Sequence, residues 1–212
     1  MQILVHLERQ ATMIDKLFDS IEMTWKKVII FAVISAIFAA TMLIIPFTIH
    51  TSLSAPGTTF EYWILAALVI IINCKKPIEA SLKTFVFFLI SQPLIYLIQV
   101  PFSNLGWNIF MYYPRWLVLT ILTIPGAFIA WYVKKDNLLS ALILSVATAF
   151  LTYQGMYYLP YVRNHFPFYS LAFIFCFALA FGLIFVLLRD KRNRIISLCI
   201  TFLALIASII LF

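Results

Sequence analysis

The side chains that could carry charge-based chemistry in this chain are few, and one of them is an acid at the start of an apolar segment. Glu61 directly precedes the apolar run Tyr62–Ile72. A carboxyl group that is partly submerged in a membrane needs a partner. The only basic residues that the topology below assigns to the same membrane surface are Arg115 and Arg163. We therefore predict that Glu61 pairs with one of these two arginines.

Aromatic and titratable side chains surround this predicted pair. Aromatic rings with a few convergent polar groups are typical of a pocket for a small ligand. The same rings are typical of an ordinary aromatic belt at the membrane surface, and the sequence leaves both interpretations open. If Glu61 and either His50 or His165 converged in an outward cleft, they could also share acid–base catalysis. The candidate ligand-binding residues at this surface are Glu61, Arg115, Arg163, His50, His165, Tyr112 and Tyr157.

A second candidate site lies in the middle of the third and fourth apolar runs. Gln92 precedes Pro93, and Pro125 lies within the next run. Proline removes a backbone hydrogen bond and kinks a helix, which frees carbonyl groups that could line a site. Transporters place broken helices near the middle of the bilayer for this purpose. Gln92 is therefore a further candidate ligand-binding residue, and the alternative is an interhelical hydrogen bond with no functional role.

The elements that must position these residues are transmembrane helices. The chain has 212 residues, of which 64% are hydrophobic and 11% are charged. A soluble domain is usually about half apolar and about a quarter charged, and a chain of this size could not bury so much apolar surface in water. The composition therefore predicts an all-α, polytopic integral membrane protein. It excludes a soluble enzyme, a secreted disulfide scaffold and a nucleic-acid-binding domain.

Seven apolar runs approach the length that a helix needs to cross a bilayer, which is about 20 residues. The second run is weak, because its strictly apolar part is only Tyr62–Ile72. The predicted transmembrane helices are 28–49, 56–74, 84–101, 116–133, 138–159, 168–188 and 195–212. Residues 28–212 are thus predicted to form one seven-helix transmembrane domain.

The basic residues predict how these helices are oriented. If all seven runs cross, 13 of the 15 Lys and Arg residues fall on one side, and only Arg115 and Arg163 fall on the other. Lys and Arg are enriched in cytoplasmic loops. We therefore predict a cytoplasmic N-terminus, an external C-terminus and a multi-pass location in the cell membrane. Without the second run as a span the basic loops would fall on both sides, so the charge pattern also supports that run.

Residues 1–27 precede the first span and predict a short cytoplasmic amphipathic helix. Apolar residues recur at helical spacing from Leu7 to Trp25. The segment before Lys26 contains more acids than bases, whereas a helix that lies on anionic lipid is usually basic. We therefore favour packing on the protein's own cytoplasmic face or on a partner, with lipid contact as the alternative.

Small residues recur every four positions in three of the predicted spans. Such stripes let membrane helices approach closely. They are Ala32, Ala36 and Ala40; Ala141, Ser145 and Ala149; and Ala172, Cys176 and Ala180. The stripes favour packing within the chain, although an external partner could use the same kind of surface.

The stretch from Trp25 to Ala36 resembles the start of the substrate-binding subunits of energy-coupling-factor vitamin transporters. Those subunits dock on a membrane partner through a small-residue stripe, so the resemblance implies docking through Ala32, Ala36 and Ala40. It covers only this short stretch. Those subunits also usually have one span fewer than the seven predicted here, so we do not infer membership of the family.

The predicted spans contain no carboxyl pair, Ser/His pair or metal-ligand spacing at a usable depth. We therefore expect no cofactor and no metal site, and an enzyme is the least supported interpretation. The first functional hypothesis is a transporter-like protein that binds or transports a small molecule through an outward-opening aromatic and polar pocket. The alternative is a non-catalytic accessory or scaffolding subunit of a membrane complex. The expected partners are the lipid bilayer, with a small-molecule ligand under the first hypothesis and a membrane or cytoplasmic subunit under the second, and no nucleic acid.

Overall fold

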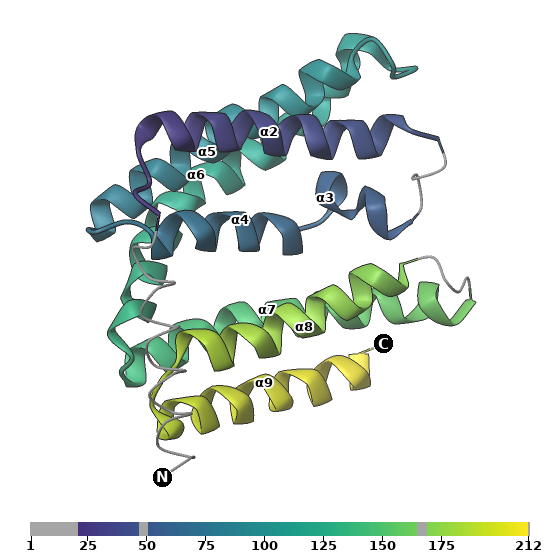
Figure 1. Ribbon diagram of the computed structural model, residues 1–212. Coiled ribbons are helices and arrows are strands. Elements are labelled where there is room, and N and C mark those ends of the chain that lie inside the picture. The colour runs from purple at the N-terminus through teal and green to yellow at the C-terminus, as the bar shows by residue number, and fades with distance from the viewer. Residues whose placement is uncertain (1–20, 47–50, 165–168, 212) are drawn as a thin grey trace.

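The computed structural model describes residues 21–46, 51–164 and 169–211, and every regular element in these ranges is a helix (Figure 1). The longer helices are α2 (Trp25–Ile44), α4 (Glu61–Ile72), α5 (Pro77–Gln99), α6 (Tyr113–Ala130), α7 (Leu138–Asn164), α8 (Ser170–Leu187) and α9 (Lys191–Leu211). The shorter segments are η1 (Ser52–Ser54), α3 (Ala55–Thr58), η2 (Gly106–Tyr112) and η3 (Trp131–Lys135). The predicted all-helical class is confirmed.

The lengths and composition of these helices fit a polytopic membrane protein. In the described ranges, 6 helical stretches are long and apolar enough to cross a bilayer, namely α2, α5, Gly106–Lys135, α7, α8 and α9. The segment Ser52–Thr58 and helix α4 form a further apolar pair that is bent by 63°, which gives up to 7 spans if the pair crosses as one. The weak second run of the sequence is therefore the one that does not form a single straight helix.

The predicted amphipathic helix at the N-terminus is tested only at its end. Residues 1–20 lie outside the described part of the chain. Residues Trp25–Lys27, which were assigned to that helix, are instead the first residues of α2. The side chain of Thr24 explains this earlier start, because it caps the helix by accepting the backbone N–H of Lys27 at 3.3 Å.

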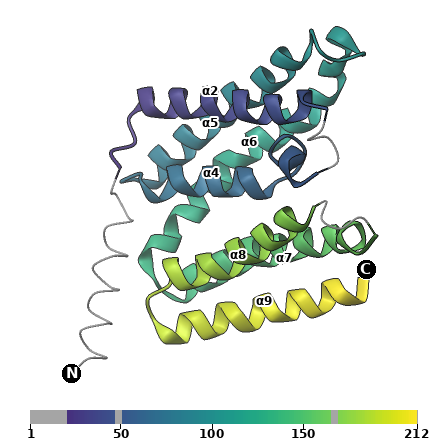
Figure 2. The same cartoon turned by 45° about the vertical axis from the view of Figure 1, so that its right-hand side comes forward.

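The helices form two groups, which lie one above the other in Figure 1 and stay separate in the turned view of Figure 2. The first group contains α2, α4, α5 and α6, and both α2 and α6 pack on α5. The second group contains α7, α8 and α9, and α7 packs on both of the other helices. Segment η3 contacts α7 at one end of the molecule, and η1 contacts α8 at the other.

Small residues bring α2 close to its neighbours in the first group. Ala32, Ala36 and Ala40 are fully buried. The Tyr62 hydroxyl donates to the Ser35 hydroxyl at 3.1 Å and ties α4 to the same helix. The docking of an external partner through this stripe, which the resemblance to vitamin-transporter subunits implied, is therefore wrong, because the chain itself covers the stripe. The interpretation as internal packing is confirmed.

A seam of hydroxyl groups joins α7 to α9 in the second group. The Ser145 hydroxyl donates to that of Ser197 at 3.2 Å, and the hydroxyls of Thr148 and Thr201 lie 2.7 Å apart. Lipid tails are as apolar as the helices, so the hydrophobic effect does not favour association of helices in a membrane. Interhelical hydrogen bonds such as these stabilise the association instead. The predicted stripe of small residues on the neighbouring α8 is buried as well, at Ala172, Cys176 and Ala180.

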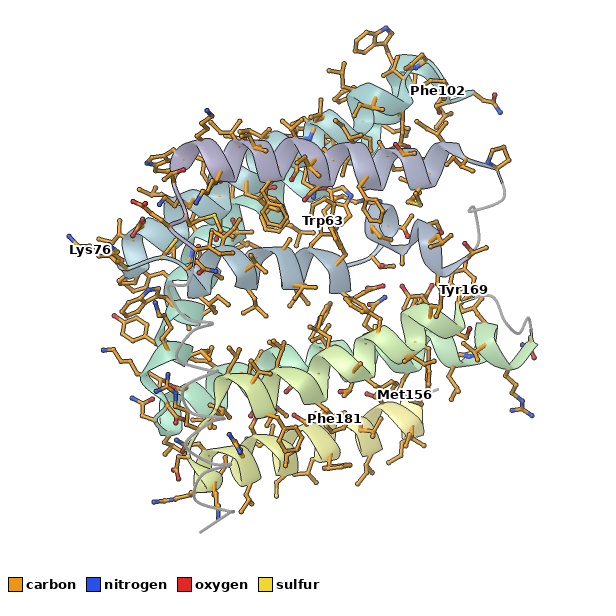
Figure 3. All side chains as sticks on the ribbon, in the orientation of Figure 1. Trp63, Lys76, Phe102, Met156, Tyr169 and Phe181 are labelled. Atoms are coloured by element: carbon orange, nitrogen blue, oxygen red, sulfur yellow. The ribbon has the colours of Figure 1, made fainter. Side chains whose placement is uncertain are left out.

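The two ends of the helices differ in their side chains. One end, called the basic end below, contains residues 21–27, 73–83, 131–136 and 188–194. The other, called the tyrosine end, contains residues 51–60, 99–115, 157–164 and 169–171. Lys76 marks the basic end in Figure 3, and Tyr169 marks the tyrosine end.

Polar contacts at the basic end fix the start of α2 to the α4–α5 turn. Lys83 is buried, forms an ion pair with Glu79 and donates a hydrogen bond to the Met23 carbonyl oxygen. The backbone N–H of Ile21 donates to Asn73 Oδ1 at 2.9 Å. A buried lysine is tolerated here because its ammonium group donates hydrogen bonds to both an acid and a carbonyl oxygen.

Asp136 joins the turn before α7 to the turn between α8 and α9. Its carboxylate accepts the backbone N–H groups of Arg189 and Asp190, each at 2.9 Å. The Asn193 side-chain amide donates to the Asp136 carbonyl oxygen at 3.0 Å. Asp136 itself is left-handed, with φ 45° and ψ 52°, a conformation that Asp and Asn adopt more readily than other non-glycine residues. Asp136 thus fixes the α8–α9 turn to the start of α7 at the basic end.

We expect Asp136→Ala to lower the free energy of unfolding by about 1–3 kcal/mol, because two N–H groups lose their acceptor and alanine disfavours the left-handed backbone. Asp136→Asn keeps an acceptor oxygen and tolerates that backbone, so it should lose much less. Unfolding of the purified protein in detergent measures both, and Asp190→Asn, at an exposed acid nearby, is the control. Equal losses for the Ala and Asn variants would contradict this role.

Candidate functional site

The second apolar segment is broken directly before Glu61. Helix α3 ends at Thr58, Thr59 is extended with φ −129° and ψ 177°, and α4 starts at Glu61 after the bend of 63°. The Thr58 hydroxyl donates to the Ser54 carbonyl oxygen at 3.2 Å, and the Thr59 hydroxyl to that of Ala55 at 2.7 Å. Backbone groups inside a bilayer must find partners within the protein. The two hydroxyls are thus satisfied within the segment, and the backbone N–H of Thr59 donates to the Ala55 carbonyl oxygen at 2.9 Å.

The two prolines that were expected to kink helices lie inside helices that run on past them. Helix α5 runs through Pro93, and α6 runs through Pro125. The segment that is broken into two helices is the weakest apolar run, which contains α3 and α4. The reason is that each proline here costs one backbone hydrogen bond within an otherwise long helix, whereas α3 ends after 4 residues.

Glu61 is almost completely buried, with an exposed fraction of 1%. Its Oε1 accepts hydrogen bonds from the Thr59 and Tyr158 hydroxyls, both at 2.8 Å. The Thr59 hydroxyl has only one proton and is shared with the Ala55 carbonyl oxygen, so Tyr158 is the one full donor. Oε2 has no hydrogen-bond partner among the described residues. The carboxyl group is therefore under-satisfied within the described part of the chain, which is costly for a buried polar group.

The predicted ion pair between Glu61 and an arginine is wrong. In residues 21–46, 51–164 and 169–211, the salt bridge that forms is the one between Lys83 and Glu79. Arg115 lies in the first turn of α6 and Arg163 in the last turn of α7, and both are exposed. At a helix end a long arginine side chain keeps its charge in water, which is less costly than burial beside the acid.

The other two titratable candidates, His50 and His165, lie outside the described residues. The structure therefore does not place them relative to Glu61. They remain predictions from the sequence.

A cavity of about 400 Å³ lies beside the broken span, and we call it the tyrosine cavity. Tyr158 and Thr59, which both donate to Glu61, form part of its wall. The rings of Tyr158 and Tyr169 are stacked with centroids 5.7 Å apart, and Tyr161 lies 5.3 Å from Tyr169. In Figure 3, Tyr169 lies between the two helix groups at this end. The wall consists of Leu43, Ser54, Thr58, Thr59, Tyr157, Tyr158, Tyr161 and Tyr169.

The phenols give this cavity neutral hydrogen-bonding groups. Tyr169 precedes α8 in a left-handed conformation with φ 65°. Burial raises the pKa of its phenol, and the neighbouring Tyr161 adds to the rise. The phenol therefore stays protonated at neutral pH, where it can both donate and accept. Tyr157, a predicted ligand-binding residue, lines the same cavity and is 43% exposed.

Two other predicted residues, Gln92 and Tyr112, line a separate cavity of about 270 Å³ on the α5–α6 side of the broken span. Gln92 is buried, and its Nε2 has no hydrogen-bond partner among the described residues. The interhelical hydrogen bond that was the alternative role for its amide nitrogen is thus not formed in the described part of the chain. The nitrogen is a donor that could serve a bound molecule.

Leu43 and Thr58 line both cavities and so form the wall between them. Leu43 packs closely on α3, since a Cβ atom added at Gly57 would lie 2.4 Å from Leu43 Cδ1. Glycine is therefore required at position 57 for the leucine to lie there. A single aliphatic side chain and one threonine separate the two spaces.

The sequence reasoning missed the residues that shape the break. Thr58 and Thr59 were read only as part of a weak span, although adjacent hydroxyls at an apolar interruption are a usable signal for a broken helix. Leu43 carried no signal, because an aliphatic residue near the end of a span has the same appearance whatever it separates.

The chain matches no protein-family model, no curated protein and no solved structure. Its function therefore has to be argued from the chemistry and geometry of the site.

The bond between Tyr158 and Glu61 predicts non-additive effects on stability. We expect a double-mutant cycle of Tyr158→Phe and Glu61→Leu to give a coupling free energy of about 1–3 kcal/mol, because either change alone removes the same hydrogen bond. The matched control is Tyr157→Phe with Glu61→Leu, since the Tyr157 hydroxyl interacts with that of Tyr161. Denaturant unfolding in detergent measures both cycles. Additive changes in the first cycle would show that the bond does not form.

Proposed function

We propose that this protein binds a small molecule in the tyrosine cavity and that the cavity opens on the outer side of the cell membrane. The observation that carries the proposal is Glu61, a buried carboxyl group whose Oε2 is unpartnered among the described residues. An ionisable residue inside a membrane segment is costly, and a functional site is the default explanation for it. The adjoining cavity, at about 400 Å³, falls in the range of about 300–1,000 Å³ that small-ligand pockets occupy.

The orientation follows from the charges at the two ends. Among the described residues, Arg115 and Arg163 are the Lys and Arg residues that do not lie at the basic end. The enrichment of Lys and Arg in cytoplasmic loops assigns the basic end to the cytoplasm and the tyrosine end to the outside. With the bent pair counted as one span, the chain crosses seven times, from a cytoplasmic N-terminus to an external C-terminus.

Transport of the bound molecule is supported by the arrangement around the break. Discontinuous helices in transporters lie at the substrate site, where their free backbone groups can face a ligand. Here the break has a cavity on either side, and Leu43 and Thr58 separate them. A shift of the short helix α3 would join the two cavities, which is the kind of change that a transport cycle requires.

The alternative of an accessory or scaffolding subunit would be favoured by a fully packed external face. Two cavities at the tyrosine end, each with an unpartnered buried polar atom in or beside its wall, support binding instead. The two hypotheses can be separated by access to the cavity from outside.

Access is tested by single cysteines in a background that lacks Cys74, Cys176 and Cys199. We expect a membrane-impermeant methanethiosulfonate reagent to label Tyr161→Cys in intact cells, because Tyr161 lines the tyrosine cavity and is 41% exposed. Lys191→Cys, at the exposed start of α9, should be labelled only after the cells are permeabilised. The reverse pattern would overturn the orientation.

Binding is tested with three probes that share a 3,3-dimethylbutyl skeleton and differ in charge. They are a cation, 3,3-dimethylbutylamine (neohexylamine), a neutral alcohol, 3,3-dimethylbutanol (neohexanol), and an anion, the carboxylate 3,3-dimethylbutanoate. We expect at least one to bind saturably to the full chain in lipid nanodiscs, as measured by isothermal titration calorimetry. Prior labelling of Tyr161→Cys should abolish this binding, because the added group occupies the cavity. If no probe binds and Tyr161→Cys is not labelled, the proposed function fails.

A further inference from the structure

We infer that the molecule bound in the tyrosine cavity is a small protonated amine with an apolar body. This inference rests on the proposed function and names the chemical class of the ligand. It follows from three properties of the cavity: the sign of the charge beside it, the direction of its hydrogen bonds and the nature of its wall.

The titratable side chain that contacts the wall of the cavity is an acid. Glu61 contacts two residues of the wall, Thr59 and Tyr158, through hydrogen bonds of 2.8 Å. The described residues that form the wall include no Lys or Arg side chain. In a buried, water-poor site a charge acts over a longer range than in water. A carboxylate at position 61 would attract a cation that enters this space and repel an anion.

Two hydroxyls of the wall, those of Tyr158 and Thr59, need a donor from the ligand. The Tyr158 hydroxyl gives its proton to Glu61, so toward the cavity it can offer only lone pairs. The Thr59 hydroxyl likewise spends its single proton on the Ala55 carbonyl oxygen and on Glu61. Glu61 lies behind this wall rather than in it, and its Oε2 has no donor among the described residues. An ammonium group carries the N–H donors that these acceptors lack.

The remainder of the wall suits an organic cation better than a metal ion. Four tyrosine rings and Leu43 form much of it. Aromatic rings attract ammonium groups through their negative faces and also bury apolar substituents. A hard metal ion such as calcium takes about six to eight oxygen ligands, which a wall of this aromatic content does not supply. The ligand class is thus an amine with a compact apolar body.

The experiment uses calorimetry to compare the affinities of neohexylamine, neohexanol and 3,3-dimethylbutanoate for the full chain in nanodiscs. We expect the amine to bind the native protein at least about tenfold more tightly than the alcohol, since charge-assisted hydrogen bonds are about twice as strong as neutral ones. Glu61→Gln should remove this preference. Asp190→Asn, the matched loss of an exposed acid at the basic end, should leave it unchanged.

Tyr158→Phe is the second variant, and it keeps the carboxyl group while removing one acceptor from the wall. The amine should bind the Tyr158→Phe variant more weakly than it binds the native protein. On this variant the amine should still bind more tightly than the alcohol. The comparison of the three probes on the native protein needs no variant, so a misfolded Glu61→Gln protein does not leave the question open.

Three outcomes would overturn the inference. One is an alcohol or carboxylate that binds the native protein as tightly as the amine, which leaves the proposed function standing with a different ligand class. Another is an unchanged preference for the amine in folded Glu61→Gln protein. The third is no binding of the amine although Tyr161→Cys is labelled from outside. Only the absence of both binding and labelling removes the proposed function as well.

Discussion

The arrangement of the site depends on the satisfaction of backbone groups where a span is broken in a medium without water. A transmembrane segment is normally a continuous helix, because each interruption exposes carbonyl and N–H groups that lipid cannot bind. The hydroxyls of Thr58 and Thr59 donate to the carbonyl oxygens of Ser54 and Ala55 at the start of α3, so both hydroxyls are satisfied next to the break. The chain can then start again as α4, with Glu61 in the first turn. An acid is favoured there by the partial positive charge of a helix N-terminus.

Once the break is fixed, three helices hold it in place, each through one hydrogen bond. The backbone N–H of Ala172 on α8 donates to the Ser52 hydroxyl at 3.0 Å. Tyr62 on α4 reaches Ser35 on α2, and Tyr158 on α7 reaches Glu61. The broken span therefore lies between the two helix groups and contacts both. Each group packs mainly within itself, through small residues and the hydroxyl seam. The space between them at the tyrosine end therefore contains the tyrosine cavity, whose wall has residues from both groups.

Composition and periodicity predicted the parts of this structure that depend on many residues at once. The helical membrane class follows from the apolar content, and the internal role of the Ala32 stripe follows from its spacing. The environment of Glu61 depends on a few residues that are distant in sequence, and charge alone suggested the wrong partner. Burying an arginine beside the acid would remove its charge from water. The apolar ring of Tyr158 can be buried at little cost, and its hydroxyl still donates a hydrogen bond to Glu61. Kinks were predicted at prolines because a proline removes one backbone hydrogen bond, whereas the two threonines at the break led to no prediction.

The cost of Glu61 argues that packing is not the reason for its presence. A leucine has a similar size and would fill the same place without removing a carboxyl group from water. Elsewhere the fold pairs its charged side chains: the buried Lys83 has both an acid and a carbonyl oxygen, and the half-buried Asp136 accepts two backbone N–H groups. The unsatisfied polar atoms in the described part of the chain are Glu61 Oε2, Thr84 Oγ1, Ser91 Oγ and Gln92 Nε2, and the first and last of them belong to residues beside the broken span. Local rules are usually broken at functional sites, while the surrounding scaffold keeps to them. Unsatisfied groups beside the broken span are what a binding site in the membrane requires, because a ligand can only be bound by groups that the protein has not already paired.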